Sequence, residues 1–219
     1  MRALVAAGLA LACISGAAFA QPATPDELAA AFDQKLERGE RIVGDIAAMY
    51  ARDQFVRQLI MEGFRQEMTS ETREAYIART QRHFDRIDGE NTRRLQGILR
   101  RVSWEELMAI SPRAADQAFS IVSHSRDLAF KRSMLDVFEP LARAGRMPGD
   151  RVALLVDDVA LEEGRGQVYG TNFECHHGAF MPKPIEDPEH LAERRAALGL
   201  STMEQYTAEQ VQLYGACPD

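Results

Sequence analysis

The sequence predicts a mainly α-helical fold, a single-domain helical bundle with one small β-hairpin near residues 155–173. Apolar side chains recur at helical spacing through most of the chain between residues 24 and 144. Patterns typical of helix starts, with Ser or Thr shortly before an acidic residue, also recur along the chain. Turn residues frame a strand-like pattern at one place, after residue 152.

The first twenty residues predict an export signal. Arg2 is their single charge, residues 3–16 are almost all apolar or small, and Ala18-Phe19-Ala20 has the small-x-small pattern of a signal-peptidase site. The apolar run is short for a membrane span. We therefore expect a signal peptide at 1–20, one mainly helical domain at 21–219, and a periplasmic or secreted protein. Lipid anchoring through Cys13 is the alternative.

Composition narrows the range of partners. The formal net charge is −7, and removal of Arg2 with the signal takes it to −8 (−7 − 1). An acidic chain argues against nucleic acid as a partner. The rest of the chain has no second long apolar stretch, so we expect no stable membrane insertion after signal removal.

A carboxylate lies on the apolar stripe of the first expected helix, which begins at residue 24. Asp53 is seven residues from both Ile46 and Ile60, and Arg57 follows one turn later on the same face. A core-facing carboxylate is costly unless it is paired. Asp53 and Arg57 are therefore expected to form either a buried ion pair or the wall of a polar pocket.

The helical spacing continues through the middle of the chain. A second helix starts at Ser70-Glu71, with an interruption expected at Asp88-Gly89. Trp104 is expected to anchor a short helix in the core. The helix that opens at Ser111-Pro112 ends near His124, whose imidazole titrates near neutrality and is therefore a candidate functional group.

The C-terminal third is rich in polar groups. Residues 152–159 either end a helix or begin a strand, and Gly166 to Phe173 is typical of the second arm of a hairpin. The polar side chains of that arm, Gln167, Tyr169 and Thr171, suit the wall of a pocket. Further along, Arg194 and Arg195 flank the apolar stripe of a later helix, so at least one guanidinium is expected to point inward.

Two cysteines, Cys175 and Cys217, remain after the signal. In an oxidising compartment an even pair predicts a disulfide. A metal site would have to use Cys175 with His176, His177 and His190. Adjacent His side chains diverge in most backbone conformations and the disulfide competes for the thiol, so we expect no metal and no other cofactor.

An acid–base site is a more specific hypothesis for these side chains than a metal site. His124, Asp53, Asp157 and Tyr169 are able to share or exchange protons if the fold brings them together. Arg57, Arg194 or Arg195 would then hold an anionic group of a ligand.

An ordered series of residues in the chain carries a family resemblance. The series is Trp104, Ser123-His124-Ser125, Asp157, Gln167-x-Tyr169-Gly170-Thr171, Pro184-Ile185-x-Asp187, Arg194-Arg195-x-x-x-Gly199-Leu200 and Tyr206, with Asp53-Gln54-x-x-Arg57 upstream. It resembles the bacterial family catalogued as domain of unknown function 6624. The resemblance implies a mostly helical fold and no established reaction. The chain departs from that family's pattern at Ser123 and Asn172, where the family tends to have Gln, and at Asp158, where it tends to have Arg.

Three functions remain open on the sequence. The first is an exported protein that binds a small polar or peptide-like ligand in a pocket built from the polar residues above. The second is a metal-independent hydrolase or lyase, with His124 as general base and Asp53 or Asp157 orienting it. The third is a scaffold without a pocket, in which these polar residues only brace helices.

Overall fold

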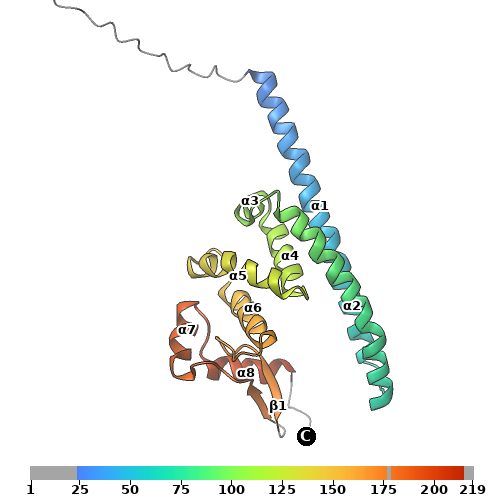
Figure 1. The fold of residues 1–219 in the computed structure, drawn as a ribbon, viewed down its shortest axis with the longest axis vertical. Helices are drawn as coiled ribbons and strands as arrows, with labels where there is room; N and C mark the ends of the chain where they lie inside the picture. Colours follow the sequence, from blue (N-terminus) through green and yellow to red (C-terminus); the bar gives the residue numbers. More distant parts are fainter. Residues whose placement is uncertain (1–23, 177–178, 215–219) are drawn as a thin grey trace, which may run out of the picture. The chain divides into compact units, whose positions relative to one another are not determined.

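The computed structural model describes residues 24–176 and 179–214 (Figure 1). The predicted signal peptide lies outside the described residues. By their contacts the residues form two units, one ending at Arg38 and one beginning at Gly39, and the helix α1 (Pro25–Phe64) contains residues of both. The start of α1 has the expected capping box, because the Glu27 N–H donates to Thr24 Oγ1 and the Thr24 N–H donates to the Glu27 carboxylate.

The unit that begins at Gly39 is mainly helical with one small hairpin, which confirms the predicted fold class. After the rest of α1 come α2 (Ser70–Leu99), α3 (Trp104–Ile110), α4 (Pro112–Ser123), α5 (Leu128–Arg143), α6 (Gly149–Glu162), β1 (Phe173–His176), β2 (Ala179–Pro182), the 3-10 helix η1 (Pro188–His190), α7 (Leu191–Ala197) and α8 (Met203–Tyr214). Across the described stretches, none of the helices combines the length and apolarity needed to cross a membrane.

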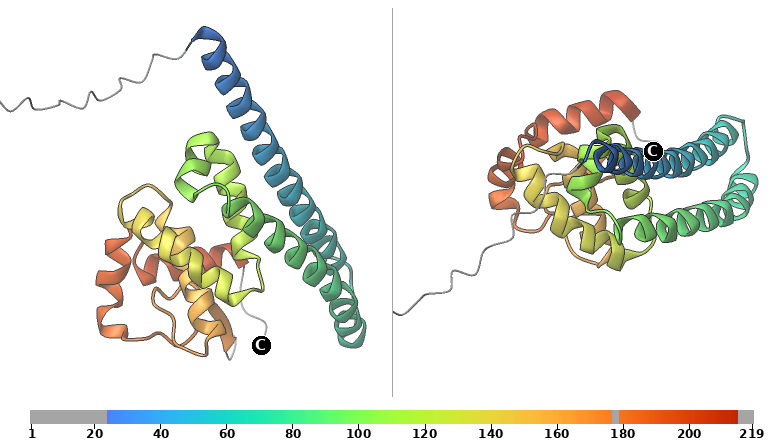
Figure 2. Two further views of the ribbon diagram at one scale, coloured as in Figure 1. Left: turned by 45° about the horizontal axis from the view of Figure 1, so that its top comes forward. Right: turned by 90° about the horizontal axis from the view of Figure 1, so that it is seen from above.

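Helix α2 runs antiparallel to the part of α1 that belongs to this unit (Figure 2). The Tyr76 hydroxyl donates to the carbonyl of Ile60 (3.0 Å), and farther along α2 the Asn91 amide donates to the carbonyl of Met49 (3.2 Å). The α1 partner moves toward its N-terminus as α2 advances, so the two helices point in opposite directions. The interruption expected at Asp88-Gly89 is absent, because α2 is continuous from Ser70 to Leu99. A glycine inside a helix costs about 1 kcal/mol, which the contacts with α1 offset.

The core of the unit is built mainly from α3, α4, α5 and α6. Phe138 of α5 is fully buried, with the Trp104 ring 4.6 Å away edge-on and the Phe119 ring 5.0 Å away. These aromatic pairs join three helices around one side chain. Trp104 therefore anchors its short helix in the core, as the sequence predicts.

The hairpin lies farther along the chain than expected. Residues 155–162 belong to α6, and the antiparallel strands are β1 and β2, paired from Phe173 opposite Pro182 to Cys175 opposite Phe180 and His176 opposite Ala179. The run that suggested a strand places Val152, Val156 and Val159 on the buried side of a helix. A short Val-rich run does not distinguish a buried helix from a strand, and packing against α5 decides it here.

Candidate functional site

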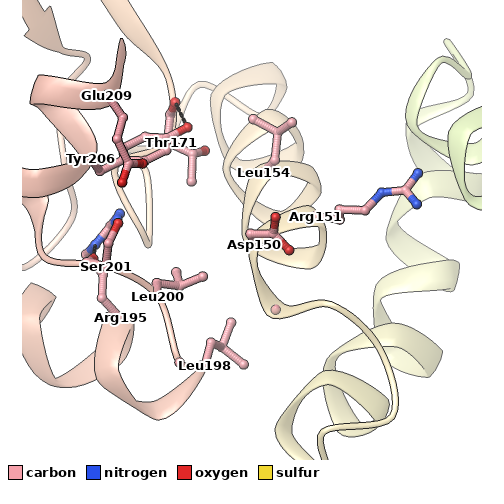
Figure 3. Close-up of a pocket in the computed structure, with 12 residues that line it drawn as sticks. Asp150, Arg151, Leu154, Thr171, Arg195, Leu198, Leu200, Ser201, Tyr206 and Glu209 are labelled. Atoms are coloured by element: carbon pink, nitrogen blue, oxygen red, sulfur yellow. Dashed lines mark hydrogen bonds between the residues drawn. The ribbon is translucent and has the colours of Figure 1, made fainter. Parts of the chain in front are cut away.

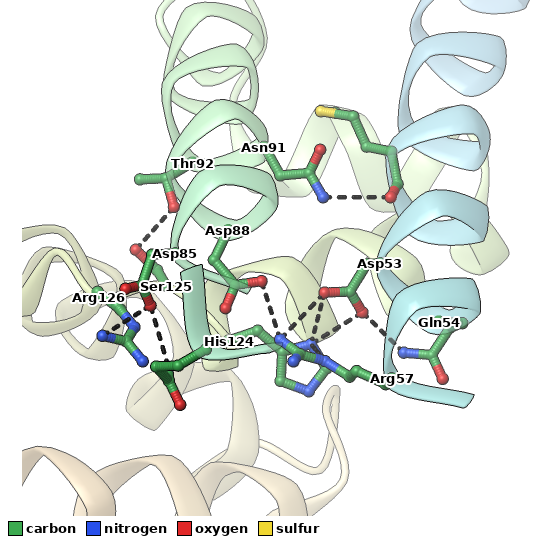
Figure 4. Close-up of polar contacts among 12 residues, drawn as sticks. Asp53, Gln54, Arg57, Asp85, Asp88, Asn91, Thr92, His124, Ser125 and Arg126 are labelled. Carbon is green, nitrogen blue, oxygen red and sulfur yellow. Dashed lines mark hydrogen bonds and ion pairs between the residues drawn. The ribbon is translucent and has the colours of Figure 1, made fainter. Parts of the chain in front are cut away.

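Three helices bring an imidazole, a guanidinium and two carboxylates together (Figure 4). His124 Nδ1 lies 2.9 and 3.1 Å from the two carboxylate oxygens of Asp53, which is 1% exposed. Arg57 Nη2 lies 3.1 Å from Asp53 Oδ1 and 3.0 Å from Asp88 Oδ1. Asp53 and Arg57 come from α1, Asp88 from α2 and His124 from the C-terminal cap of α4. We call these four residues the His124 cluster.

Arg57 and Asp53 compete for His124 Nδ1. The Arg57 Nε–H has the geometry of a donor to this nitrogen at 3.0 Å, and the two Asp53 oxygens lie 2.9 and 3.1 Å from it. Only one of the two neighbours can form a hydrogen bond to Nδ1 in a given protonation state, because a carboxylate only accepts and a guanidinium only donates. A lone pair facing the oxygens of a buried carboxylate would be strongly repelled. We therefore assign the proton to Nδ1, donated to Asp53.

The surroundings of the other ring nitrogen, Nε2, differ from those of Nδ1. Nε2 points away from Asp53 in Figure 4, and no side chain or backbone group of the described residues forms a hydrogen bond with it. The His124 side chain is 32% exposed, whereas the Asp53 side chain is 1% exposed. A buried carboxylate thus contacts a half-buried imidazole.

The two carboxylates of the His124 cluster differ in their electrostatics. Burial raises the pKa of Asp53, but the hydrogen bond and charge of His124 and the charge of Arg57 outweigh it, so the pKa lies below its ordinary value. Burial also raises the pKa of Asp88, and there Arg57 only partly offsets it, so the pKa lies above its ordinary value. The hydrogen bond with His124 therefore distinguishes Asp53 from Asp88, whereas Arg57 lowers the pKa of both carboxylates.

Asp157 has a different setting, because the loop that follows α6 folds around its carboxylate. Asp157 Oδ1 accepts the backbone N–H groups of Val168 (2.7 Å) and Tyr169 (2.8 Å). Its Oδ2 accepts the backbone N–H and the hydroxyl of Thr171, at 2.7 and 2.8 Å. Four donors saturate this carboxylate, so it fixes the shape of the loop.

Gln167 and the two arginines extend the same bracing. The Gln167 amide donates to the carbonyls of Asn172 and Lys183 and accepts the Asn172 N–H. Arg194 Nε donates to the carbonyl of Val168 at 2.8 Å. Arg195 is 3% exposed and donates to the carbonyls of Tyr169 and Ser201. The guanidinium of Arg195 therefore points inward, as the sequence predicts for one of the pair.

The structure divides the candidate residues into two groups. The His124 cluster contains His124, Asp53 and Arg57. The second group, which we call the Asp157 loop group, consists of Asp157, Gln167, Tyr169, Thr171, Arg194 and Arg195. Among the described residues no hydrogen bond or ion pair joins the two groups. The single pocket expected from the sequence, built from both groups, stays a prediction.

Cys217 lies outside the described residues, so its pairing with Cys175 stays a prediction. Within the described ranges, 24–176 and 179–214, no group of three or more His, Cys, Asp or Glu side chains is placed to hold a metal ion.

Asp88 is the one member of the His124 cluster that is not among the residues expected from the sequence to form a site. Because Gly89 follows it, the sequence predicts a helix interruption at Asp88. The spacing of Asp88 with Asn91, Leu95 and Ile98 places all four on one face of α2, and the structure buries all four. That periodicity would have identified a second core-facing carboxylate.

The family model described as a family of unknown function (DUF6624) matches residues 41–217. No curated protein and no solved structure matches the chain. Two positions at which the chain departs from the pattern of the resemblance, Asp158 and Asn172, contact each other, because the Asn172 amide donates to Asp158 Oδ1 at 3.0 Å.

Proposed function

Because the chain belongs to the family of unknown function DUF6624, its activity has to be argued from its own side chains, and we propose that it is a hydrolase or lyase in which His124 is the general base. The observation that carries the proposal is the 2.9 Å contact between His124 Nδ1 and the buried carboxylate of Asp53. This contact holds the Nδ1 proton and leaves the Nε2 lone pair facing outward.

The proton transfer follows from that tautomer. In a hydrolysis, Nε2 accepts a proton from a water molecule while the water oxygen bonds to an acyl carbon. The imidazolium then returns this proton to the leaving group as the acyl bond breaks. In a lyase reaction Nε2 would instead take a proton from a carbon next to a carbonyl group. The C–H electron pair then forms a carbon–carbon double bond as the group on the neighbouring carbon leaves, and the imidazolium gives its proton to that leaving group. Asp53 is the orienting acid, since all four bonds to the Asp157 carboxylate come from its own loop.

The cluster around the His124 ring carries a net negative charge. With Asp53 and Asp88 ionised, Arg57 leaves a net charge of −1 (−1 − 1 + 1). The positive charge that develops on the ring during proton transfer therefore meets a site of net negative charge.

The test is a substrate panel with a matched histidine control. His190 also contacts a carboxylate, that of Asp187 at 2.8 Å, but this pair is exposed. On ester and amide substrates, we expect His124→Ala and Asp53→Asn to lower kcat by roughly 10²–10⁴-fold, and His190→Ala to leave it unchanged. Turnover that survives His124→Ala contradicts the proposal. No turnover on any ester or amide of the panel contradicts a hydrolase.

A second candidate function is the binding of a small polar or peptide-like ligand. A cavity of about 450 Å³ favours it, because Thr171 and Arg195 of the Asp157 loop group line this cavity. His124 is not among its lining residues. The third function, a scaffold without a pocket, is supported only by Asp157 and Gln167. Their hydrogen bonds all go to other groups of the protein.

We also propose that the protein is exported to the periplasm or secreted, which rests on the first twenty residues of the sequence. The N-terminus of the protein recovered from the periplasmic fraction or the medium is then Gln21, which mass spectrometry of the intact chain measures. The same sample should contain no free thiol if Cys175 pairs with Cys217.

A further inference from the structure

The cavity beside the Asp157 loop group contains a buried positive charge without a counter-ion. Arg195 is 3% exposed, and its hydrogen bonds go to the carbonyls of Ser201 (2.7 Å) and Tyr169 (2.6 Å). Its guanidinium carbon lies 5.0 Å from the centre of the Tyr206 ring. Within the described part of the chain no carboxylate forms an ion pair with it. Carbonyl groups satisfy donors without neutralising the charge, so an anionic group in the cavity would be stabilised.

The other arginine of this cavity is engaged elsewhere. Arg151 points away from the cavity toward α4 (Figure 3), where it pairs with Asp116 and donates to Ser120 Oγ. Burial lowers the pKa of Arg195, while Tyr206, Asp157 and Glu209 oppose this shift. Arg195 is therefore the cation that faces a ligand in this cavity.

Two acidic residues line the same cavity. Asp150 at the start of α6 and Glu209 on α8 are both exposed. An anion without a positive group would meet attraction from Arg195 and repulsion from these two carboxylates. A cation alone would meet the reverse. A molecule with both charges satisfies all three side chains.

We propose that this cavity binds a small zwitterion, a free amino acid or a short peptide, with its carboxylate at Arg195 and its ammonium group toward Glu209 and Asp150. This inference rests on the binding function proposed above as the second candidate, and it is independent of chemistry at His124. A volume of about 450 Å³ is ample for a dipeptide.

The experiment avoids changing Arg195, because its bonds brace the loop and its loss could unfold the protein. Leu154 lines the cavity and is 44% exposed, so Leu154→Trp should fill the cavity without disturbing the core. Leu213→Trp is the matched control, since Leu213 is 70% exposed on α8 and does not line the cavity. The probes for titration calorimetry are L-alanine, L-alanyl-L-alanine, its N-acetyl derivative and inorganic phosphate.

We expect L-alanyl-L-alanine to bind, and N-acetylation of it or the change Leu154→Trp to weaken its binding at least tenfold. Phosphate should bind at least tenfold more weakly than the dipeptide. Glu209→Gln should weaken the dipeptide severalfold, and Leu213→Trp and His124→Ala should not affect it. The proposal is overturned if neither L-alanine nor the dipeptide binds, if phosphate or the acetylated peptide binds as tightly, or if Leu154→Trp and Leu213→Trp have the same effect. If phosphate binds as tightly as the dipeptide, the proposed binding function still holds, and only the proposal that the ligand is a zwitterion is contradicted.

Discussion

Asp53 and Asp157 are both buried carboxylates, yet they have opposite relations to their surroundings. Asp157 is saturated by four donors from the loop that it holds. Asp53 faces the imidazole of His124, the guanidinium of Arg57 and the amide of Gln54 (2.8 Å). A saturated carboxylate stabilises a conformation, whereas a carboxylate against an imidazole also sets the position of a proton.

Asp157→Asn is expected to destabilise the protein by about 3 kcal/mol, because an amide nitrogen would then face backbone N–H donors in a buried site. The control is its neighbour Asp158, which is half-buried and accepts one amide, so Asp158→Asn should change stability by less than about 1 kcal/mol. Urea unfolding of both variants measures the difference. Equal losses would show that the loop does not depend on the four bonds to Asp157.

His124→Ala is expected to change the free energy of unfolding by less than about 1 kcal/mol, because the side chain is 32% exposed and Arg57 still pairs with Asp53. Thermal and urea unfolding measure this. If the variant unfolds, His124 has a structural role and the loss of activity expected above could not be assigned to a missing base.

The pH dependence of stability should separate the two carboxylates of the His124 cluster. The pKa of Asp88 is raised in the folded state, so its contribution to stability is present below the ordinary Asp pKa of about 4 and is lost as the pH rises through the raised value. Asp53 has a lowered pKa, so its contribution is present above the ordinary value and is lost as the pH falls through the lowered one.

Asp88→Asn removes the first of these contributions. The stability of the variant relative to the unchanged protein should therefore rise as the pH increases from about 4 toward neutrality. Urea unfolding at a series of pH values gives the two curves. A difference that is constant or falls with pH would mean that Asp88 is not penalised by burial.

Two glycines in helices test the packing of the helix backbones. Gly44 lies inside α1 with no atom within 4 Å of an added Cβ, so Gly44→Ala should stabilise the protein by up to about 1 kcal/mol. Gly149 begins α6, and its added Cβ would lie 2.3 Å from the carbonyl oxygen of Leu198. Gly149→Ala should destabilise by roughly 1–3 kcal/mol, because backbone must shift to make room. Changes of the same sign in thermal unfolding would contradict this packing.

Local patterns predict the elements well where one helix face decides them. The stripe from Ile46 through Asp53 to Ile60 is the buried face of α1, and the Asp53–Arg57 pair forms as the spacing predicts. Predictions fail where packing between helices decides. Gly89 does not interrupt α2, and residues 155–162 are helical because they pack in the core. Neither the continuous α2 nor the helical conformation of residues 155–162 can be predicted from residues that are adjacent along the chain.

For the whole molecule, the sequence predicts which polar residues contact one another less well than it predicts which polar residues are buried. Asp53 and His124 are 71 residues apart, and their contact depends on the packing of α1, α2 and α4. Tyr169 and Thr171 carry equally suggestive side chains, but the loop around Asp157 places them with Arg195 instead. The residue types alone do not predict which of these side chains belong to the His124 cluster and which to the Asp157 loop group. The packing of the helices determines it.

The proposal that His124 is a general base is tested most directly by the protonation of its two ring nitrogens. ¹⁵N NMR measures this at a pH where the imidazole is neutral. If Asp53 holds this histidine as a general base, the proton resides on Nδ1 and Nε2 is unprotonated, and Asp53→Asn weakens that preference. A neutral ring with its proton on Nε2 would mean that Arg57 donates to Nδ1. The His124 cluster would then be a structural brace with no lone pair to offer a substrate.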